Sequence, residues 1–292
     1  TDPKRLETAK EKVPELADVP TYSDYKDLIK NGGLDAVQIN TPHTLHYEQI
    51  MNSLDAGLHV LTEKPMVCST AHAKDVIKKA EEVGKVLMIS YQRHFQPQYR
   101  YIKQVVESGQ LGEVTYLSAL QCQGWKKGTA GTWRQIPELS GGGQLNDSGS
   151  HLLDMVLWLT GLTAESVHAF IDNCGTPVDI NSALSLKFKS GAQGTVSVVG
   201  DAPCWWEDFT IWGENGVLFY RNGKLTHCDS KRNMIEPEDT TDYGNPDKNL
   251  IDAILGRDVV WAPPVCGLRV IELTEAAWRS GELGKPVKVE SL

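Results

Sequence analysis

The chain has 292 residues, 40% of them hydrophobic, and a formal net charge of −9. This length suits two modest domains, and a negative charge without a run of Lys and Arg offers nothing to the phosphates of a nucleic acid. No segment approaches the ~20 apolar residues that cross a bilayer, and the start lacks the apolar core of a signal peptide. We therefore expect a cytoplasmic protein without a nucleic-acid or membrane partner.

The first part of the chain predicts a parallel sheet. Apolar strands are expected at residues 34–40, 59–62 and 86–90, and amphipathic helices separate them. Ser69 is expected to cap the second of these helices and Gly84 to end it. Strands that alternate with helices are typical of a parallel sheet covered by helices.

The pattern changes at Gly112, after a further helix at about 98–107. Short segments rich in β-forming residues follow, with glycine-containing turns at 189–191 and 213–216 that indicate hairpins. These segments are residues 114–122, 166–172, 182–188, 193–199, 209–212 and 217–220. They predict an α+β domain with an open, mainly antiparallel sheet.

Two helices accompany this sheet, at about 150–159 and 267–280, and residues 234–246 are the most loop-like stretch. We therefore divide the chain into domains at 1–111 and 112–292. The helix at 267–280 could pack back on the first domain. The six cysteines lie far apart without a C-x-x-C pair, which indicates reduced thiols.

The sequence Asn40-Thr41-Pro42-His43 stands at the carboxyl end of the first predicted strand, where open α/β sheets bind ligands. Thr41 and Pro42 would then line a cofactor groove. The alternative is an ordinary turn in which the proline sets the bend and Thr44 caps the next helix.

Glu63-Lys64-Pro65 follows the second predicted strand in the same way. A lysine at this edge points toward the ligand crevice. It can exchange a proton with a hydroxyl only if its pKa falls, as a desolvated pocket or a cationic nicotinamide would cause. The alternative is a surface lysine before a turn proline.

The third cluster is the glycine-rich loop 141–146, which leads into Asp147 and His151. If a helix starts near Asp147, the two side chains lie on one face, where His151 can act as a general base and Asp147 can orient a substrate. The alternatives are an N-capping aspartate with a core histidine, and a metal site completed by Asp154. We expect no metal.

Aromatic side chains accompany this loop. Trp133-Arg134 lies just upstream, and Trp125, Trp205 and Trp206 fall in the same domain. Their planes suit the apolar faces of sugar rings, although tryptophans are more often core residues.

Taken together, these motifs in this order resemble the glucose-fructose oxidoreductase / inositol dehydrogenase (Gfo/Idh/MocA) family, from Asp2 to about Pro286. The resemblance implies a Rossmann domain that binds NAD or NADP, and an oxidoreductase acting on the carbinol carbon of a sugar or polyol. It implies that Lys64 and His151 serve the reacting carbon and that Asp147 contacts the substrate.

The resemblance also implies a set of residues near the cofactor, among which Pro65 often follows a cis peptide bond. The set consists of Thr41, Pro42, His46, Glu63, Lys64, Pro65, Arg93, Trp133 and Arg134. Members of the family commonly form homodimers or homotetramers through the open sheet, which we also expect here.

The chain departs from the family at its start. The family's first strand and its G-x-G-x-x-G turn are missing, and Thr1 to Glu15 resembles the stretch after the second strand, so roughly 30 residues of the βαβ unit have no counterpart. We therefore expect an N-terminally truncated Rossmann domain. Either the chain is a fragment or it has lost normal pyrophosphate binding.

Two other functions remain open on the same fold. One is a glycosidase that uses tightly held NAD in a transient oxidation, and the other is a non-catalytic regulator that senses a dinucleotide or sugar. The sequence does not decide between NAD and NADP, and it does not identify the substrate or the direction of reaction.

Overall fold

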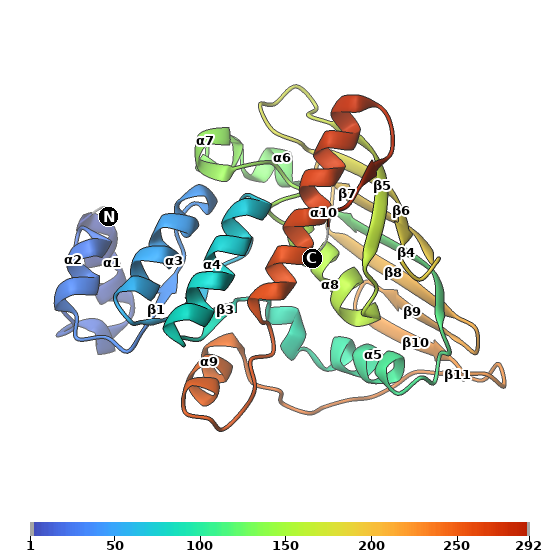
Figure 1. Ribbon diagram of the computed structural model, residues 1–292, viewed down its shortest axis with the longest axis horizontal. Coiled ribbons are helices and arrows are strands. Elements are labelled where there is room, and N and C mark those ends of the chain that lie inside the picture. Colours follow the sequence, from blue (N-terminus) through green and yellow to red (C-terminus); the bar gives the residue numbers. More distant parts are fainter. Residues whose placement is uncertain (1–2, 291–292) are drawn as a thin grey trace.

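Two β-sheets organise the chain in the computed structural model, which describes residues 3–290 (Figure 1). Two N-terminal helices, α1 (Pro3–Lys12) and α2 (Tyr25–Asn31), lie beside the first sheet, with the short turn η1 (Pro14–Leu16) between them. Asp24 caps α2 by accepting a hydrogen bond from the Lys26 amide. Within the described range, no helix is both long and apolar enough to cross a bilayer.

The first sheet has three parallel strands in the order β1-β2-β3. They are β1 (Ala36–Ile39), β2 (His59–Thr62) and β3 (Leu87–Ile89). Helices α3 (His46–Asp55) and α4 (Thr70–Val83) connect them, and α5 (Pro97–Glu107) follows. The predicted caps of α4 are present, because Ser69 accepts from the His72 amide and Gly84 has a φ of 64°. The predicted parallel sheet is confirmed.

The second sheet has nine strands in the order β11-β10-β9-β8-β4-β7-β6-β5-β12. Only the β4–β7 pair among them is parallel in the described residues. The strands are β4 (Val114–Cys122), β5 (Ala164–Asp172), β6 (Asn181–Phe188), β7 (Gln193–Val199), β8 (Trp206–Gly213), β9 (Val217–Arg221), β10 (Lys224–Cys228), β11 (Met234–Ile235) and β12 (Val287–Lys288). The predicted α/β fold with an open, mainly antiparallel second sheet is confirmed.

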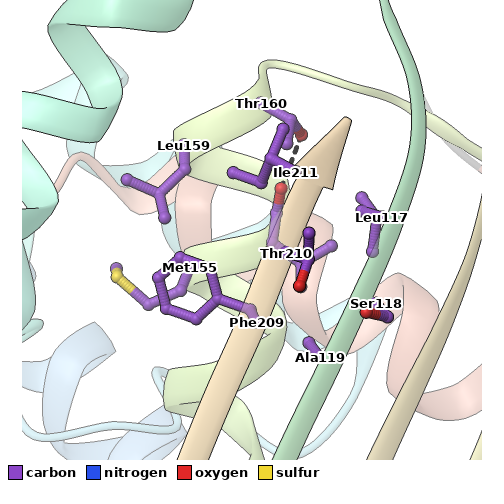
Figure 2. Close-up of a pocket in the computed structure, with 10 residues that line it drawn as sticks. Leu117, Ser118, Ala119, Met155, Leu159, Thr160, Phe209, Thr210 and Ile211 are labelled. Atoms are coloured by element: carbon purple, nitrogen blue, oxygen red, sulfur yellow. Dashed lines mark hydrogen bonds between the residues drawn. The ribbon is translucent and has the colours of Figure 1, made fainter. Parts of the chain in front are cut away.

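Helices α8 (Gly149–Thr160) and α10 (Pro264–Leu283) cover one face of this sheet (Figure 1). The space between α8, β4 and β8 is filled by apolar side chains around a cavity of about 10 Å³ (Figure 2). A cavity of this size holds one water molecule at most, so it is a packing defect and not a ligand site.

Helix α10 also contacts the first sheet. It packs against α4 and β3 as well as β5. A Cβ on Gly267, in its first turn, would lie 2.7 Å from Ile89 Cδ1 and 2.8 Å from Met66 Cβ, so only glycine permits this approach. The division at residues 111 and 112 stays a prediction.

The other face of the second sheet carries exposed aromatic side chains. Cross-strand register places Tyr116 opposite Trp212 and Cys122 opposite Trp206, on the same face as Phe170. Phe170 is 72% exposed and the other three aromatics about 40%. We call these four aromatic residues the outer aromatic face.

Several short elements were not predicted. They are α6 (Trp125–Gly128), α7 (Pro137–Ser140), α9 (Pro246–Ile254), β10, β11, β12 and the single turns η2 (His43–Leu45), η3 (Gln92–Phe95) and η4 (Trp133–Gln135). Most of them are too short to show a periodic pattern.

Candidate active site

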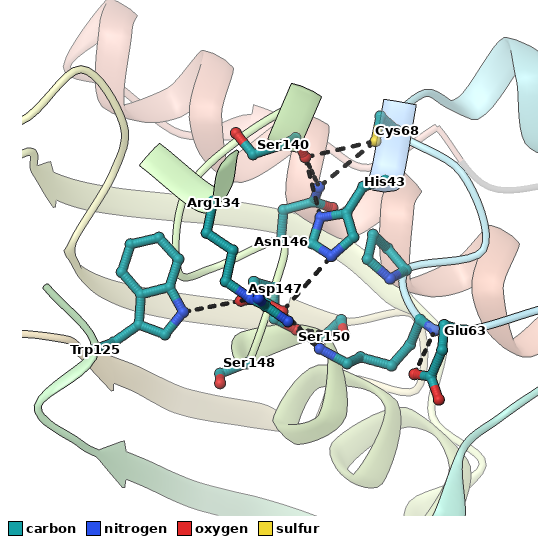
Figure 3. A network of polar contacts seen from close by, with 12 residues as sticks. His43, Glu63, Cys68, Trp125, Arg134, Ser140, Asn146, Asp147, Ser148 and Ser150 are labelled. Carbon is teal, nitrogen blue, oxygen red and sulfur yellow. Dashed lines mark hydrogen bonds and ion pairs between the residues drawn. The ribbon is translucent and has the colours of Figure 1, made fainter. Parts of the chain in front are cut away.

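Side chains from the turns and short helices beside both sheets meet at the carboxylate of Asp147 (Figure 3). Lys64, which follows β2, places Nζ 2.6 Å from Asp147 Oδ1. Trp125 donates its indole N–H to Oδ2 over 2.9 Å, and Arg134 donates Nε–H to the same oxygen over 3.0 Å. His43 lies close by, with Nε2 3.6 Å from Oδ1. Three of the residues predicted for the site therefore lie in one network.

This network keeps Asp147 ionised. Burial by itself would raise the pKa of the carboxyl, but the charge of Lys64 and the hydrogen bonds that Lys64 and Trp125 donate outweigh it, and the pKa lies well below its usual range. A buried carboxylate is stable only when donors satisfy its oxygens. Asp147 is therefore a fixed negative charge at the centre of the site.

Lys64 is held in a defined position by the same residue. Its Nζ contacts the backbone carbonyl of Asp147 over 3.2 Å in addition to the carboxylate. An ammonium group has three N–H donors, so two contacts leave one donor for a further acceptor. The Lys64–Pro65 peptide bond is cis, as the family resemblance implied.

His151 lies in the first turn of α8 and is half-buried, near the charges of Lys64 and Arg93. Burial lowers its pKa well below the ordinary value, and the charges of Lys64 and Arg93 lower it further. The ring is therefore neutral at physiological pH. Its Nδ1 has no hydrogen-bond partner within the described part of the chain, so His151 can accept a proton.

The helix containing His151 begins at Gly149, one residue before the predicted start at about 150. Asp147 lies in the preceding turn and is not a residue of the helix. Ser148 is the capping position, and its side chain makes no capping hydrogen bond. The alternative of an N-capping aspartate was therefore wrong. The turn nevertheless brings Asp147 to Lys64.

Asp179 holds the glycine-rich loop that leads to Asp147. Its carboxylate accepts from the amides of Gly143 (2.8 Å) and Leu145 (2.7 Å) and from the indole of Trp278 (3.1 Å). A Cβ on Gly143 would lie 1.9 Å from the Asp179 carbonyl oxygen, so the loop needs glycine there. Burial raises the pKa of Asp179, and the three donors oppose this effect.

The predicted cofactor residues near β1 line a cavity of about 630 Å³. Thr41 and Pro42 contribute to its wall, and the Thr41 hydroxyl donates to Gln49. His46 is fully buried, with Nδ1 2.9 Å from the Pro65 carbonyl and Nε2 2.9 Å from the Thr41 carbonyl. Burial lowers the pKa of His46. His46 thus connects the turns after β1 and β2, and its contact with a cofactor stays a prediction.

The remaining predicted residues lie around the network. Glu63 accepts from the Lys64 amide. Arg93 forms an ion pair with Glu207 over 2.5 Å, while its Nη1 is buried without a partner in the region described. Trp133 packs edge-on against His43, with ring centroids 4.7 Å apart, and the Arg134 guanidinium lies over the Trp133 ring. The roles of these residues stay predictions.

The tryptophans suggested as sugar-binding planes occupy other positions. Trp125 is buried and uses its indole to hold Asp147. Trp206 belongs to the outer aromatic face, and the neighbouring Trp205 is 47% exposed. The contacts that His43 and Trp125 make with Asp147 could not be predicted, because the residues are far apart along the chain.

Comparison with known proteins identifies the family. Residues 4–91 match the oxidoreductase family with an NAD-binding Rossmann fold, and residues 99–219 match the GFO/IDH/MocA C-terminal domain. The two matches account for most of the chain and follow each other in the order that the fold shows. The chain belongs to the Gfo/Idh/MocA oxidoreductase family.

Individual relatives agree with this assignment. The rhizopine catabolism protein MocA of Rhizobium meliloti is 31% identical over 69% of this chain and 65% of its own length. The D-glucoside 3-dehydrogenase of Escherichia coli is 30% identical over 56% of this chain and 47% of its own length. The WlbA dehydrogenase of Bordetella pertussis, solved with NADH and UDP-GlcNAcA, superposes with a TM-score of 0.85 at 23% identity, covering 100% of this chain and 89% of that one. The chain spans about half the length of the curated relatives it matches.

Proposed function

We propose that the protein is an NAD(P)-dependent dehydrogenase that acts on a carbinol carbon of a sugar, polyol or related compound. The observation that carries this proposal is the meeting of Lys64, Asp147 and His151 beside the carboxyl end of β2. This edge of a parallel sheet is where α/β folds bind ligands. The combination supplies a fixed cation, a fixed anion and a neutral base.

The cavity at the end of β1 fits part of a dinucleotide. Its volume of about 630 Å³ lies in the range of cofactor sites. The buried Nη1 of Arg93, which lacks a partner in the described residues, offers a further donor after β3, on the side of the site near His151. Thr41, Pro42, Glu63, Arg93 and Trp133 would hold the cofactor, which supplies the hydride acceptor or donor when bound.

The proton is handled by the chain's own residues. The uncommitted N–H of Lys64 would hydrogen-bond the substrate oxygen and stabilise negative charge on it. His151, kept neutral by its surroundings, would take the hydroxyl proton during oxidation and return it during reduction. Asp147 would keep Lys64 aimed at that oxygen.

The substrate class rests on the relatives. One relative is named as a dehydrogenase of D-glucosides, and the WlbA dehydrogenase was solved with UDP-GlcNAcA, so both proteins are associated with a compound that contains a sugar ring. Two alternative functions exist on this fold, an NAD-dependent glycosidase and a non-catalytic regulator, and one experiment distinguishes both from a dehydrogenase.

The test starts with titrations of the protein with NADH and with NADPH, in which the quenching of its tryptophan fluorescence reports binding. A panel of sugars, polyols and glycosides is then assayed for reduction of the bound or added cofactor at 340 nm. Saturable binding with cofactor reduction supports a dehydrogenase. Release of sugar from a glycoside without net cofactor reduction indicates the glycosidase, and binding without turnover indicates the regulator.

We also propose that two or more copies associate through the outer aromatic face. Its four aromatics are exposed on one face of the sheet, on strands β4, β5 and β8, and exposed aromatic side chains are enriched in the surfaces that proteins bury on association. Light scattering should report a dimer or tetramer, and Trp212→Arg should shift the mass toward that of one chain. A monomeric parent protein would contradict this proposal. The cytoplasmic location stays a prediction.

A further inference from the structure

A second buried network lies beside the candidate active site and is not used by the proposed reaction. His94, which follows β3, places Nε2 2.7 Å from Asp154 Oδ2 and Nδ1 2.8 Å from the Trp261 carbonyl oxygen. His94 and Asp154 are 0% and 1% exposed. Three separate chain segments therefore meet at one imidazole: the end of the first sheet, helix α8 and the loop before α10.

The partners of His94 hold its ring from both sides. Nδ1 faces the Trp261 carbonyl, which can only accept, so Nδ1 carries a proton and donates it. Nε2 shares the second hydrogen bond with the carboxyl group of Asp154. The Trp158 ring stacks on His94 at a centroid distance of 3.8 Å. The ring therefore has a fixed position and a buried carboxyl partner.

The same groups could be mistaken for a metal site. His94, Asp154 and Cys266 offer ligand atoms that lie within 4.8 Å of one another. A metal would need a ring-nitrogen lone pair, and both nitrogens of His94 are already in hydrogen bonds. It would also need a thiolate, and burial together with the charge of Asp154 raises the pKa of Cys266. The contacts fit a hydrogen-bonded pair better than a metal site.

The pair connects to His151 by two routes. Asp154 follows His151 by three residues, so both lie on one side of α8 and the pair fixes the rotation of this helix. The ring of Tyr91 lies between the two histidines. It stacks on His94 with centroids 5.8 Å apart and meets His151 edge-on at 6.0 Å.

We propose that the His94–Asp154 pair is a positioning device for His151, which holds α8 against the first domain and fixes the His151 ring through Tyr91. This inference rests on the proposed function only in that it assigns His151 to proton transfer. The pair itself can be observed without any assay of activity.

The experiment compares Asp154→Asn with the double variant His94→Phe/Asp154→Leu in the full chain. Asp154→Asn should lower kcat by on the order of 100-fold, because a small displacement of a reacting group has effects of this size. KM and the dissociation constant for NADH should change less than about 3-fold, since neither residue contacts the proposed ligands. The double variant replaces the pair with apolar groups, so it should regain thermal stability but not kcat.

Ser280→Ala is the matched control. Ser280 is also 0% exposed and hydrogen-bonds Ala169 and Lys285 at the far end of α10. It should lose stability and keep kcat. If the double variant regains both stability and kcat, the pair is merely structural and the proposal is overturned.

Histidine nitrogen NMR separates this proposal from the proposed function. Labelled wild-type protein should show both nitrogens of His94 in hydrogen bonds, and Asp154→Asn should shift the His151 signals as well as those of His94. A protein without dehydrogenase activity that shows this coupling would overturn the proposed function and leave the pair as the support of His151. His151 signals unchanged by Asp154→Asn would overturn the positioning role.

Discussion

Lys64 and Asp147 are 83 residues apart along the chain, yet their charged groups lie 2.6 Å apart. The lysine follows β2 in the first domain, and the aspartate precedes α8 in the second. Their contact is mostly shielded from water, because the side chains are 14% and 6% exposed. This pair is the basis of the first prediction.

Lys64→Met keeps the length of the side chain and removes its charge. We expect kcat to fall by about 10²–10⁴-fold, the range associated with a positioned proton-handling group. NADH binding should change little. Steady-state kinetics and fluorescence titration measure the two effects. Lys126→Met, which breaks the exposed Lys126–Asp201 pair, is the control and should remain active. Full activity in Lys64→Met would exclude Lys64 from the reaction.

Acid should destabilise the protein through its buried histidines. Burial lowers the pKa of His43 to about 3, whereas an unfolded histidine titrates near 6.5. Between these values the unfolded chain binds a proton that the folded chain does not, so stability falls as the pH falls. One such group contributes a slope of about 1.4 kcal/mol per pH unit. Urea unfolding between pH 4.5 and 7.5 should therefore show a smaller slope in His43→Asn.

The lowered pKa of Asp147 acts in the same direction at lower pH. Its contribution to stability is complete above the unfolded value of about 4 and is lost as the pH falls toward the folded pKa. The window above pH 4.5 therefore lies above the pH range in which Asp147 contributes a slope. An unchanged slope in His43→Asn would mean that His43 titrates alike in the folded and unfolded chains.

Asp179→Ala should disorganise the loop before Asp147. Two backbone amides and the Trp278 indole would lose their common acceptor. We expect a loss of about 2–6 kcal/mol in the free energy of unfolding, since two buried amides are left unsatisfied and each such donor costs about 1–3 kcal/mol. Denaturant titration measures this loss. Asp172→Ala, which removes an exposed carboxylate bonded to the Cys174 amide, should cost much less.

Gly143→Ala tests the same loop by steric means. The added methyl group would lie 1.9 Å from a backbone oxygen, which cannot move away as a flexible side chain can. We expect a loss of more than about 3 kcal/mol in stability, the upper range of overpacking effects. Gly128→Ala is the matched control, because its Cβ position is open. Equal melting temperatures for the two variants would contradict the described loop.

Much of this fold could be predicted from the sequence because its signals are local. Ser69 and Gly84 mark the ends of α4, and alternating residues mark β6 and β7. The position of Lys64 also followed from local order, since a residue directly after a parallel strand must lie at the ligand-binding edge. The family motifs added Asp147 and His151.

The contacts that complete the site could not be predicted in this way. Asp179 lies 36 residues after Gly143, and His94 lies 60 residues before Asp154. Neither pair has a periodic or spacing signal, because the two partners are far apart along the chain and meet only through tertiary packing. The N-capping alternative for Asp147 was wrong for a related reason. Tertiary contacts of Asp147 replace the capping role that its residue type suggests.

The carboxylate of Asp147 also has a consequence for engineering this family. It takes donors from the first domain through Lys64 and from the second through Trp125 and Arg134. Neither domain can be exchanged for that of a relative unless the replacement brings matching donors, since an orphaned buried carboxylate would cost several kcal/mol. Recombination between relatives should therefore succeed where these partners are inherited together, even when the crossover falls in an otherwise suitable loop.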